Sequence, residues 1–358
     1  MKITPRLEID LDKIEHNART LVERLALRGI SVTGITKAVL ASREICGALL
    51  RAGVTALGDS RIENIEGMCR EQLMTQLILI RTPMLSQVKR VVNCADVSFN
   101  TEISVIEKLS YFSKQENKMH GIILMVELGD LREGIMPDNL MDVVLKTLQL
   151  PNIILKGIGC NLACRSGVVP DDRNMAELTF LAESIEAMFG VKLDIISGGN
   201  SANLTWVFNG MDTGRINNIR LGESIFLGCD PLNRQPIDGL FPDAVTLIAE
   251  VIESKKKPSK PWGKIAQTAF GVNLPATDIG SVSQSILAIG LQDTDTTGLF
   301  PPPGIDILGA SSDHIILKSD LSVGAEVRFG VNYSAMLRAM TSPFIAKEYL
   351  TPNGRLHL

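Results

Sequence analysis

An alternation of short apolar runs with amphipathic segments fills the chain between Val32 and Leu221. The runs have the length and composition of buried strands, and most are followed by apolar residues at helical spacing. They span residues 32–36, 55–58, 76–80, 96–99, 121–128, 154–159, 193–196 and 218–221. Strands that helices connect run parallel, so eight units in about 200 residues predict a (β/α)8 TIM barrel. A doubly wound open sheet is the alternative, but Lys37-Ala38-Val39 lacks the glycines of its phosphate loop.

The pattern changes after about Pro231. Prolines, including the run Pro301-Pro302-Pro303, interrupt helical spacing, and short β-type runs appear at 245–251, 285–289, 314–317 and 326–329. A chain of 358 residues is also longer than one hydrophobic core usually covers. We therefore predict a barrel domain at 1–231 and a C-terminal all-β domain at 232–358.

Composition excludes several classes of partner. The net charge is −4 and there is no sustained basic stripe, so we expect no nucleic-acid partner. No stretch is long and apolar enough to suggest a membrane span. The six cysteines have no metal-ligand spacing, so we expect no bound metal. We expect their thiols to be reduced, in a cytoplasmic protein that acts on a small molecule.

Polar residues stand directly after several of the apolar runs. They are Lys37, Asp59-Ser60-Arg61, Arg132, Asn161, the loop 197–201 and Arg220-Leu221-Gly222. Any one of them alone is explained as a turn residue. Because the strands of a barrel all end at one mouth, an amine, guanidiniums and a glycine-serine loop together predict an active site there.

Lys37 is the residue with the most specific chemistry. A lysine at the end of a buried strand is costly to desolvate, and a snorkelling side chain is its ordinary explanation. The alternative is a nucleophilic amine that forms an imine with an aldehyde cofactor. The loop Ser197-Gly198-Gly199-Asn200-Ser201 supports this alternative, because its backbone N–H groups and hydroxyls suit a phosphate.

Arg220 bears on the type of reaction. If pyridoxal 5'-phosphate (PLP) occupies the barrel mouth, an arginine facing the pyridine nitrogen keeps that nitrogen unprotonated. The ring is then a weaker electron acceptor, which favours proton exchange at Cα over deeper rearrangement. The other explanation for Arg220 is a surface ion pair with Glu223.

These motifs, with the opening segment Glu8–Asn17, resemble the fold-type-III PLP enzymes, the alanine racemase superfamily, and most of all its ornithine racemase-type amino-acid racemases. The resemblance implies that Lys37 binds PLP and is one acid/base, while Arg220 faces the pyridine nitrogen. It implies further cofactor contacts and a segment donated by the other subunit of a homodimer. The further cofactor residues are Arg132, Asn161, Ser201, Gly222 and Tyr333, and the donated substrate-binding residues are Ser312 and Asp313.

The chain departs from alanine racemase at the second base. That enzyme uses a partner-subunit tyrosine, whereas the three tyrosines here, Tyr111, Tyr333 and Tyr349, lack its sequence context. Racemisation needs a proton donor on each face of the substrate carbanion. We take His314 as the second base, with Cys160 or Cys164 as the alternatives.

The expected function is a PLP-dependent racemase that interconverts L- and D-amino acids by removing the Cα proton, with ornithine or another basic amino acid as substrate. A PLP-dependent decarboxylase or aldolase is one alternative, although the decarboxylating relatives place a carboxylate where Arg220 stands. A non-catalytic PLP-homeostasis protein is another, although that class ends at the barrel.

Overall fold

The computed structural model describes residues 3–271, 277–351 and, for the backbone, 354–357. The chain divides into two compact units. The barrel unit comprises Asp12–Pro242, and the β unit comprises Met1–Leu11 together with Asp243–Leu358.

The barrel unit contains a closed barrel of eight parallel strands, which confirms the predicted TIM barrel. The barrel closes because the first strand pairs in parallel with both the second and the last, for example Thr33 with Ala56 and with Arg220. The strands are β2 (Ser31–Ile35), β3 (Ala56–Asp59), β4 (Gln76–Leu79), β5 (Val97–Asn100), β6 (His120–Val126), β7 (Ile153–Cys160), β8 (Ile195–Ser197) and β9 (Asn218–Leu221).

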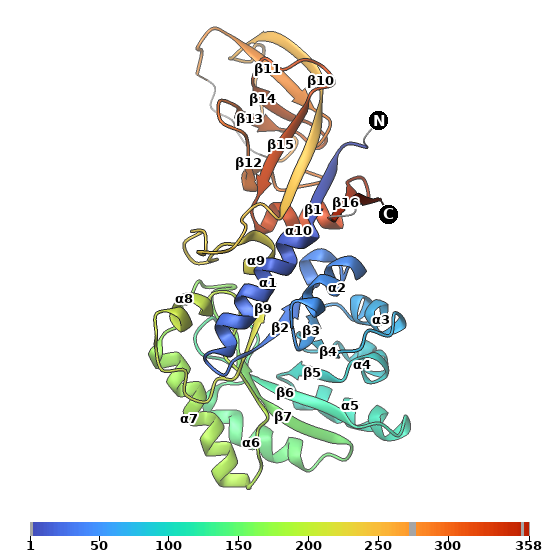
Figure 1. Ribbon diagram of the computed structural model, residues 1–358, viewed down its shortest axis with the longest axis vertical. Coiled ribbons are helices and arrows are strands. Elements are labelled where there is room, and N and C mark those ends of the chain that lie inside the picture. Colours follow the sequence, from blue (N-terminus) through green and yellow to red (C-terminus); the bar gives the residue numbers. More distant parts are fainter. Residues whose placement is uncertain (1–2, 272–276, 352–353, 358) are drawn as a thin grey trace. The chain divides into compact units, whose positions relative to one another are not determined.

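Helices alternate with these strands and lie outside the barrel (Figure 1). Their ends are set by local chemistry: the Ser42 hydroxyl caps α2, and Asp171 and Asn174 cap α7 reciprocally. The elements are α1 (Leu11–Ala26), η1 (Lys37–Val39), α2 (Arg43–Arg51), α3 (Ile62–Arg70), η2 (Leu85–Gln87), α4 (Val88–Cys94), α5 (Ile103–Gln115), α6 (Pro137–Leu148), α7 (Asp172–Phe189), α8 (Asn203–Phe208) and α9 (Glu223–Leu227).

Apolar side chains from neighbouring strands form a packed cluster in the barrel. The cluster includes Ala56, Ile78, Phe99, Ile123 and Met125, all almost fully buried. Such a core makes the barrel interior solid and leaves the strand ends as the place for chemistry.

A buried histidine, His120, begins β6. Its Nε2 lies 2.7 Å from the Ser98 Oγ, and burial lowers the pKa of His120 to about 4, against a weaker opposing hydrogen bond with the Ala95 backbone. His120 is therefore neutral in the folded protein at neutral pH.

This histidine should make the barrel less stable in mild acid. Between pH 6.5 and 4 the unfolded chain binds a proton at His120 that the folded chain does not. The free energy of unfolding therefore decreases as the pH is lowered through this range. We expect the free energy of unfolding to drop by roughly 2 kcal/mol between pH 7 and 5 through this residue. Urea titrations of the wild type and of His120→Asn at both pH values measure it. An equal pH dependence in both proteins would contradict the prediction.

The β unit contains a nine-stranded sheet, mostly antiparallel. The N-terminal strand β1, which the sequence placed with the barrel, pairs instead antiparallel with β10 and parallel with β16. The strands are β1 (Arg6–Asp10), β10 (Val245–Pro258), β11 (Ser281–Leu287), β12 (Leu299–Phe300), β13 (Asp306–Ala310), β14 (Ile315–Lys318), β15 (Glu326–Val331), β16 (Ala346–Thr351) and β17 (Gly354–His357).

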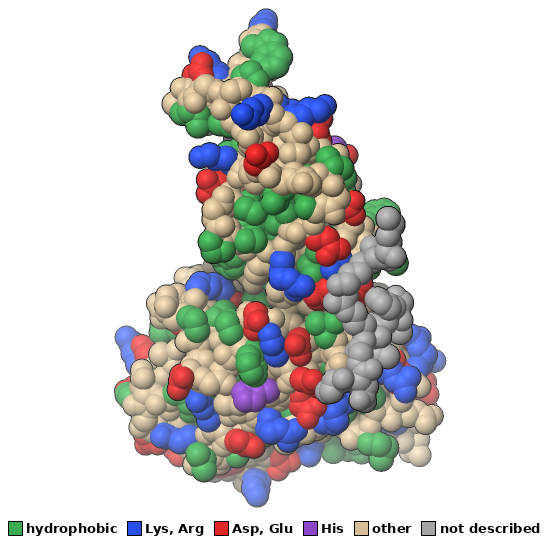
Figure 2. Space-filling model, turned by 45° about the horizontal axis from the view of Figure 1, so that its top comes forward, with side chains coloured by type: hydrophobic (Ala, Val, Ile, Leu, Met, Phe, Trp, Pro, Cys, Tyr) green, Lys and Arg blue, Asp and Glu red, His purple; other side chains and the backbone are tan. Residues whose placement is uncertain are grey.

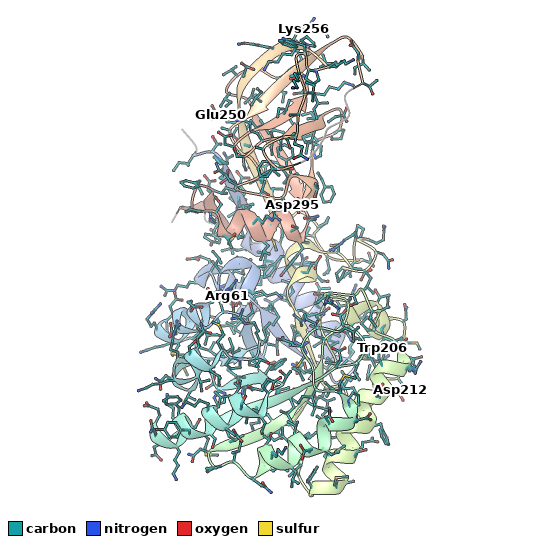
Figure 3. The ribbon with its side chains drawn as sticks, turned by 180° about the vertical axis from the view of Figure 1, so that it is seen from behind. Arg61, Trp206, Asp212, Glu250, Lys256 and Asp295 are labelled. Carbon is teal, nitrogen blue, oxygen red and sulfur yellow. The ribbon has the colours of Figure 1, made fainter. Side chains whose placement is uncertain are left out.

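The predicted all-β unit also carries one α-helix, α10 (Tyr333–Thr341). The Asn332 side chain caps it by accepting from the Ala335 N–H. Asp295 accepts from the Ser334 Oγ at 2.6 Å, which attaches the short helix η3 (Thr296–Gly298) to α10 (Figure 3). A polar cap followed by apolar residues at helical spacing was the signal for this helix.

Arg6 is the most buried charge in the β unit, with a fully buried side chain. Its Nη atoms donate to the Glu326 carboxylate at 2.7 and 2.8 Å, and its Nε and Nη2 donate to Glu8 at 3.2 and 3.1 Å. Its Nε also lies 3.5 Å from Glu348, and Arg328 donates to Glu8 at 2.7 Å. One buried guanidinium thus joins carboxylates from β1, β15 and β16.

Lys and Arg side chains alternate with Asp and Glu over the visible surface, without a basic patch (Figure 2). Among the residues described, no helix has the length and hydropathy needed to cross a membrane.

Candidate active site at the barrel mouth

A pocket of about 200 Å³ lies at the carboxyl ends of the barrel strands. The structure brings five of the polar strand-end residues named from the sequence together here, and adds Arg81 and Glu133, which the sequence analysis missed. The lining consists of Lys37, Ser60, Ile80, Arg81, Met125, Arg132, Glu133, Asn161 and Arg220. Arg61, the neighbouring strand-end residue, is exposed just before α3 (Figure 3).

Lys37 is placed by the turn that ends β2. The strand stops at Ile35, and η1 runs from Lys37 to Val39. Its C-cap Leu40 has a left-handed backbone with φ of 53°. Thr36 is fully buried and its Oγ1 donates to the Asp59 Oδ2 at 2.8 Å, which fixes this turn to the end of β3.

The environment favours the neutral form of the Lys37 amine. Burial is the main cause that lowers its pKa, and the positive charges of Arg132 and Arg220 act in the same direction. The electrostatic interactions of the amine with Cys164 and Asp59 oppose this shift without reversing it. A neutral amine is the nucleophilic form.

Lys37 should therefore react with aldehydes at lower pH than an ordinary lysine. Because its pKa is lowered, its neutral fraction rises earlier as pH increases. Reductive methylation of cofactor-free protein, followed across pH by peptide mass spectrometry, measures the midpoint. The exposed Lys260 is the comparison residue in the same samples. Equal midpoints for the two lysines would contradict the assignment.

Arg220, on β9, is a buried cation whose hydrogen bonds within the described residues go to neutral groups. Its Nη1 donates to the Ser197 Oγ at 2.6 Å, and its Nη2 donates to the Cys160 carbonyl at 2.7 Å and the Asn161 Oδ1 at 3.3 Å. Burial lowers the pKa of Arg220 to about 10, so the guanidinium stays charged at neutral pH. The alternative of a surface ion pair with Glu223 is wrong, because Arg220 is only 4% exposed and Glu223 pairs with Arg234.

The loop after β8 and the turn after β9 lie together. The Ser201 Oγ accepts from the Ser224 N–H at 3.3 Å, which joins the exits of the last two barrel strands. Gly199 has φ of +144°, which strains any other residue, and a Cβ on Gly222 would lie 3.1 Å from the Ile35 carbonyl. The two glycines keep backbone, rather than side chains, at the surface of this cradle.

Asn161 carries a buried donor that lacks a partner. Its Oδ1 accepts from Asn200 and Arg220, whereas its Nδ2 has no hydrogen-bond partner among the described residues. Leaving such a group unpaired costs about 1–3 kcal/mol. A bound molecule with an acceptor atom in the pocket would satisfy it. Cationic lining, a backbone cradle and an unpaired donor together fit an anionic cofactor such as PLP.

Two buried carboxylates, which the sequence analysis did not single out, shape the loops around this pocket. Glu127 accepts from the N–H groups of Gly129, Leu131 and Arg132 at 2.7–3.1 Å, which positions the loop that carries Arg132. Asp130 accepts from the N–H groups at 164, 165 and 166, tying this loop to the one after β7. An acidic residue in a glycine-containing turn after an apolar run was the available signal.

Cys160 and Cys164, the alternative candidates for the second base, differ in burial. Cys160 is fully buried, its Sγ donates to the Gly198 carbonyl at 3.1 Å, and burial raises its pKa to about 12, so it stays protonated and cannot be a base. Cys164 is exposed, and its Sγ lies 3.5 Å from the Asn200 Nδ2.

The remaining predicted residues belong to the β unit. Ser312, Asp313 and His314 lie together in the turn between β13 and β14, and Tyr333 is the first residue of α10. The His314 Nδ1 is 3.0 Å from the Asp313 Oδ1, which also accepts from the Ser312 Oγ at 3.1 Å. The hydrogen bond from Ser312 is the main cause that lowers the pKa of Asp313, and the interaction with His314 acts in the same direction.

Across the described part of the chain, no cluster of three or more His, Cys, Asp or Glu side chains could hold a metal ion.

The family model "Alanine racemase, N-terminal domain" matches residues 9–230, most of the chain. The chain belongs to the alanine racemase family. A solved member of this family, the alanine racemase of Clostridium difficile 630, has the same fold: its TM-score is 0.75 at 18% sequence identity, covering 99% of this chain and 98% of that one.

Two relatives are much more similar in sequence. The protein named ornithine racemase from Acetoanaerobium sticklandii is 37% identical, covering 97% of this chain and 99% of its own length. The protein named lysine racemase from Thermotoga maritima is 38% identical over the same shares of the two chains.

Proposed function

We propose that this protein is a PLP-dependent racemase that interconverts the L and D forms of a basic amino acid, with ornithine and lysine as the first substrates to test. Similarity over nearly the full length to two racemases, both named for basic amino acids, is the observation that carries the proposal. The pocket supports it, because its lining contains a lysine whose pKa is lowered by burial together with a guanidinium that is held in place.

In this proposal the barrel residues hold the cofactor. If PLP binds here, Ser201 and the backbone at Gly222 would hold its phosphate, Arg220 would hold the pyridine nitrogen, and Arg132 and Asn161 would contact the rest of the ring. Tyr333, which belongs to the β unit, is a further candidate for the phosphate. When bound, PLP withdraws electrons from the substrate and makes its Cα–H acidic.

The protein residues then move the proton. Lys37 as a neutral amine takes the Cα proton on one face and, once protonated, can return it. Arg220 keeps its charge throughout, since Ser197, Cys160 and Asn161 hold it in place. That fixed charge would disfavour a proton on the ring nitrogen of a bound cofactor, which would favour simple proton exchange.

The β unit supplies the second base in this proposal. We assign that role to His314, oriented by Asp313, with Ser312 and Asp313 contacting the substrate. As in the related enzymes, we place these residues in the site of a second copy, which makes the protein a homodimer. The six cysteines are all free thiols, which suits a cytoplasmic location.

Proton exchange in deuterium oxide tests the function. The purified protein with PLP is incubated with L-ornithine, L-lysine and the other common amino acids, and Cα deuterium, enantiomer ratio and carbon dioxide are measured. We expect deuterium at Cα and an L:D ratio near one with basic amino acids, without carbon dioxide. Release of carbon dioxide or of an aldehyde would indicate a decarboxylase or aldolase, and no exchange with any amino acid would overturn the racemase.

The second base has its own test. His314→Asn should lower racemisation by about 10²-fold or more. Cα exchange starting from one enantiomer should persist, because Lys37 still serves one face. Cys164→Ser is the matched variant, and we expect it to lose little. If Cys164→Ser loses racemisation while His314→Asn keeps it, the base is the thiol of Cys164.

A further inference from the structure

Arg81 and Glu133 line the pocket, and the cofactor contacts proposed above leave both of them unassigned. Arg81 follows β4, and Glu133 follows β6 in the loop shaped by Glu127. Both are strand-end residues of the barrel unit, in the lining that also contains Lys37.

The charges in this lining are uneven. Lys37, Arg81, Arg132 and Arg220 are cationic, and Glu133 is the one carboxylate among the residues that line the pocket. The Glu133 Oε1 is 3.9 Å from the Arg132 Nη2, too far for a hydrogen bond, and the Glu133 side chain is 26% exposed. Its acceptor capacity is therefore available to a ligand.

Arg81 is equally available. Within the described residues its guanidinium makes no hydrogen bond or ion pair, whereas Arg220 is occupied by Ser197, Cys160 and Asn161. Arg132 is assigned to the cofactor. Arg81 is thus the remaining guanidinium for an anionic group, and a planar guanidinium fits a carboxylate with two parallel hydrogen bonds.

A basic amino acid presents complementary groups. Its α-amino group goes to the cofactor, which leaves one carboxylate and one side-chain ammonium. We propose that Arg81 binds the substrate α-carboxylate and that Glu133 binds the side-chain ammonium. Ile80 and Met125, also in the lining, supply apolar surface for the methylene chain. This assignment rests on the proposed function and makes Glu133 the residue that selects basic substrates.

A carboxylate on a loop also suits two substrates of different length. Glu133 lies outside any helix or strand, and its side chain can adjust to one more or one fewer methylene. A hydrogen bond to a charged group contributes about 1.5–3 kcal/mol. Its loss corresponds to roughly a 10- to 100-fold drop in kcat/KM.

The test compares ornithine with norleucine, in which a methyl group replaces the ammonium. In Glu133→Gln we expect kcat/KM for L-ornithine to fall roughly 10- to 100-fold, mainly through KM, with norleucine unchanged or improved. Arg81→Gln should weaken both substrates by similar factors, because both carry the α-carboxylate. Glu177→Gln and Arg173→Gln, exposed on α7, are the matched controls.

A binding measurement removes the dependence on turnover. Titration calorimetry of ornithine and norleucine on borohydride-reduced protein, in which PLP is fixed to Lys37 and no turnover occurs, should show a preference for ornithine that reduced Glu133→Gln protein has lost. If the wild type racemises ornithine but Glu133→Gln keeps the ornithine-to-norleucine ratio, the Glu133 assignment is overturned and the racemase stands. If the wild type exchanges no amino acid and shows no preference for ornithine in binding, both the Glu133 assignment and the proposed racemase function are overturned.

Discussion

Lys37→Ala should lose racemase activity and the yellow colour of bound PLP together. Loss of the acid/base alone costs about 10²- to 10⁴-fold in kcat, and loss of the amine that holds the cofactor adds to it. The structure gives the reason, because Lys37 is the lysine in the pocket lining and its pKa is lowered by burial.

Three controls make this result specific. Lys256→Ala, at an exposed position on β10, should keep activity and colour (Figure 3). Circular dichroism should show an intact fold in both variants. Added methylamine should restore a fraction of the lost activity by replacing the missing amine. A Lys37→Ala protein that keeps more than about a tenth of wild-type activity would rule out Lys37 as an acid/base.

Arg6→Met should destabilise the β unit by about 3–5 kcal/mol. The change removes the cation that Glu8 and Glu326 share, while Glu8 stays buried with one guanidinium fewer. At present hydrogen bonds from Arg328 and Arg6 outweigh the effect of burial and lower the pKa of Glu8. The loss should therefore be largest at neutral pH, where Glu8 is ionised, and smaller in acid.

Arg328→Met is the matched control, because Arg328 also pairs with Glu8 but is 55% exposed. We expect it to cost at most about 1 kcal/mol. Adding Glu8→Gln and Glu326→Gln to Arg6→Met should recover part of the loss. Hydrogen exchange at the amides of β1, β10 and β15 measures the stability of this sheet directly. Equal effects of Arg6→Met and Arg328→Met would contradict a role for the buried guanidinium.

The barrel could be predicted because each of its strands is a compact apolar run that ends in polar residues. That local pattern also located Lys37, Arg132, Asn161 and Arg220, which the structure brings to one pocket. Arg81 and Glu133 follow the same rule, but a single arginine or glutamate after a strand is ordinary in sequence, and only the shared lining distinguishes them.

Other features depend on distant partners and could not be read locally. The run at Arg6–Asp10 reads as a strand, but its partners are β10 and β16, more than 200 residues further along the chain. The carboxylates of Glu127 and Asp130 look like loop residues until their backbone partners are known. The roles of Ser312, Asp313, His314 and Tyr333 stay predictions that rest on the resemblance.

Mapping the attachment site of the cofactor identifies the lysine that forms the imine. The purified protein is reduced with borohydride in the presence of PLP, digested, and the pyridoxyl-bearing peptide identified by mass spectrometry. We expect one peptide to carry the pyridoxyl label, the one that contains Lys37, and we expect the label to be absent from Lys37→Ala protein. Label on another lysine, or no label on a folded protein saturated with PLP, would contradict it.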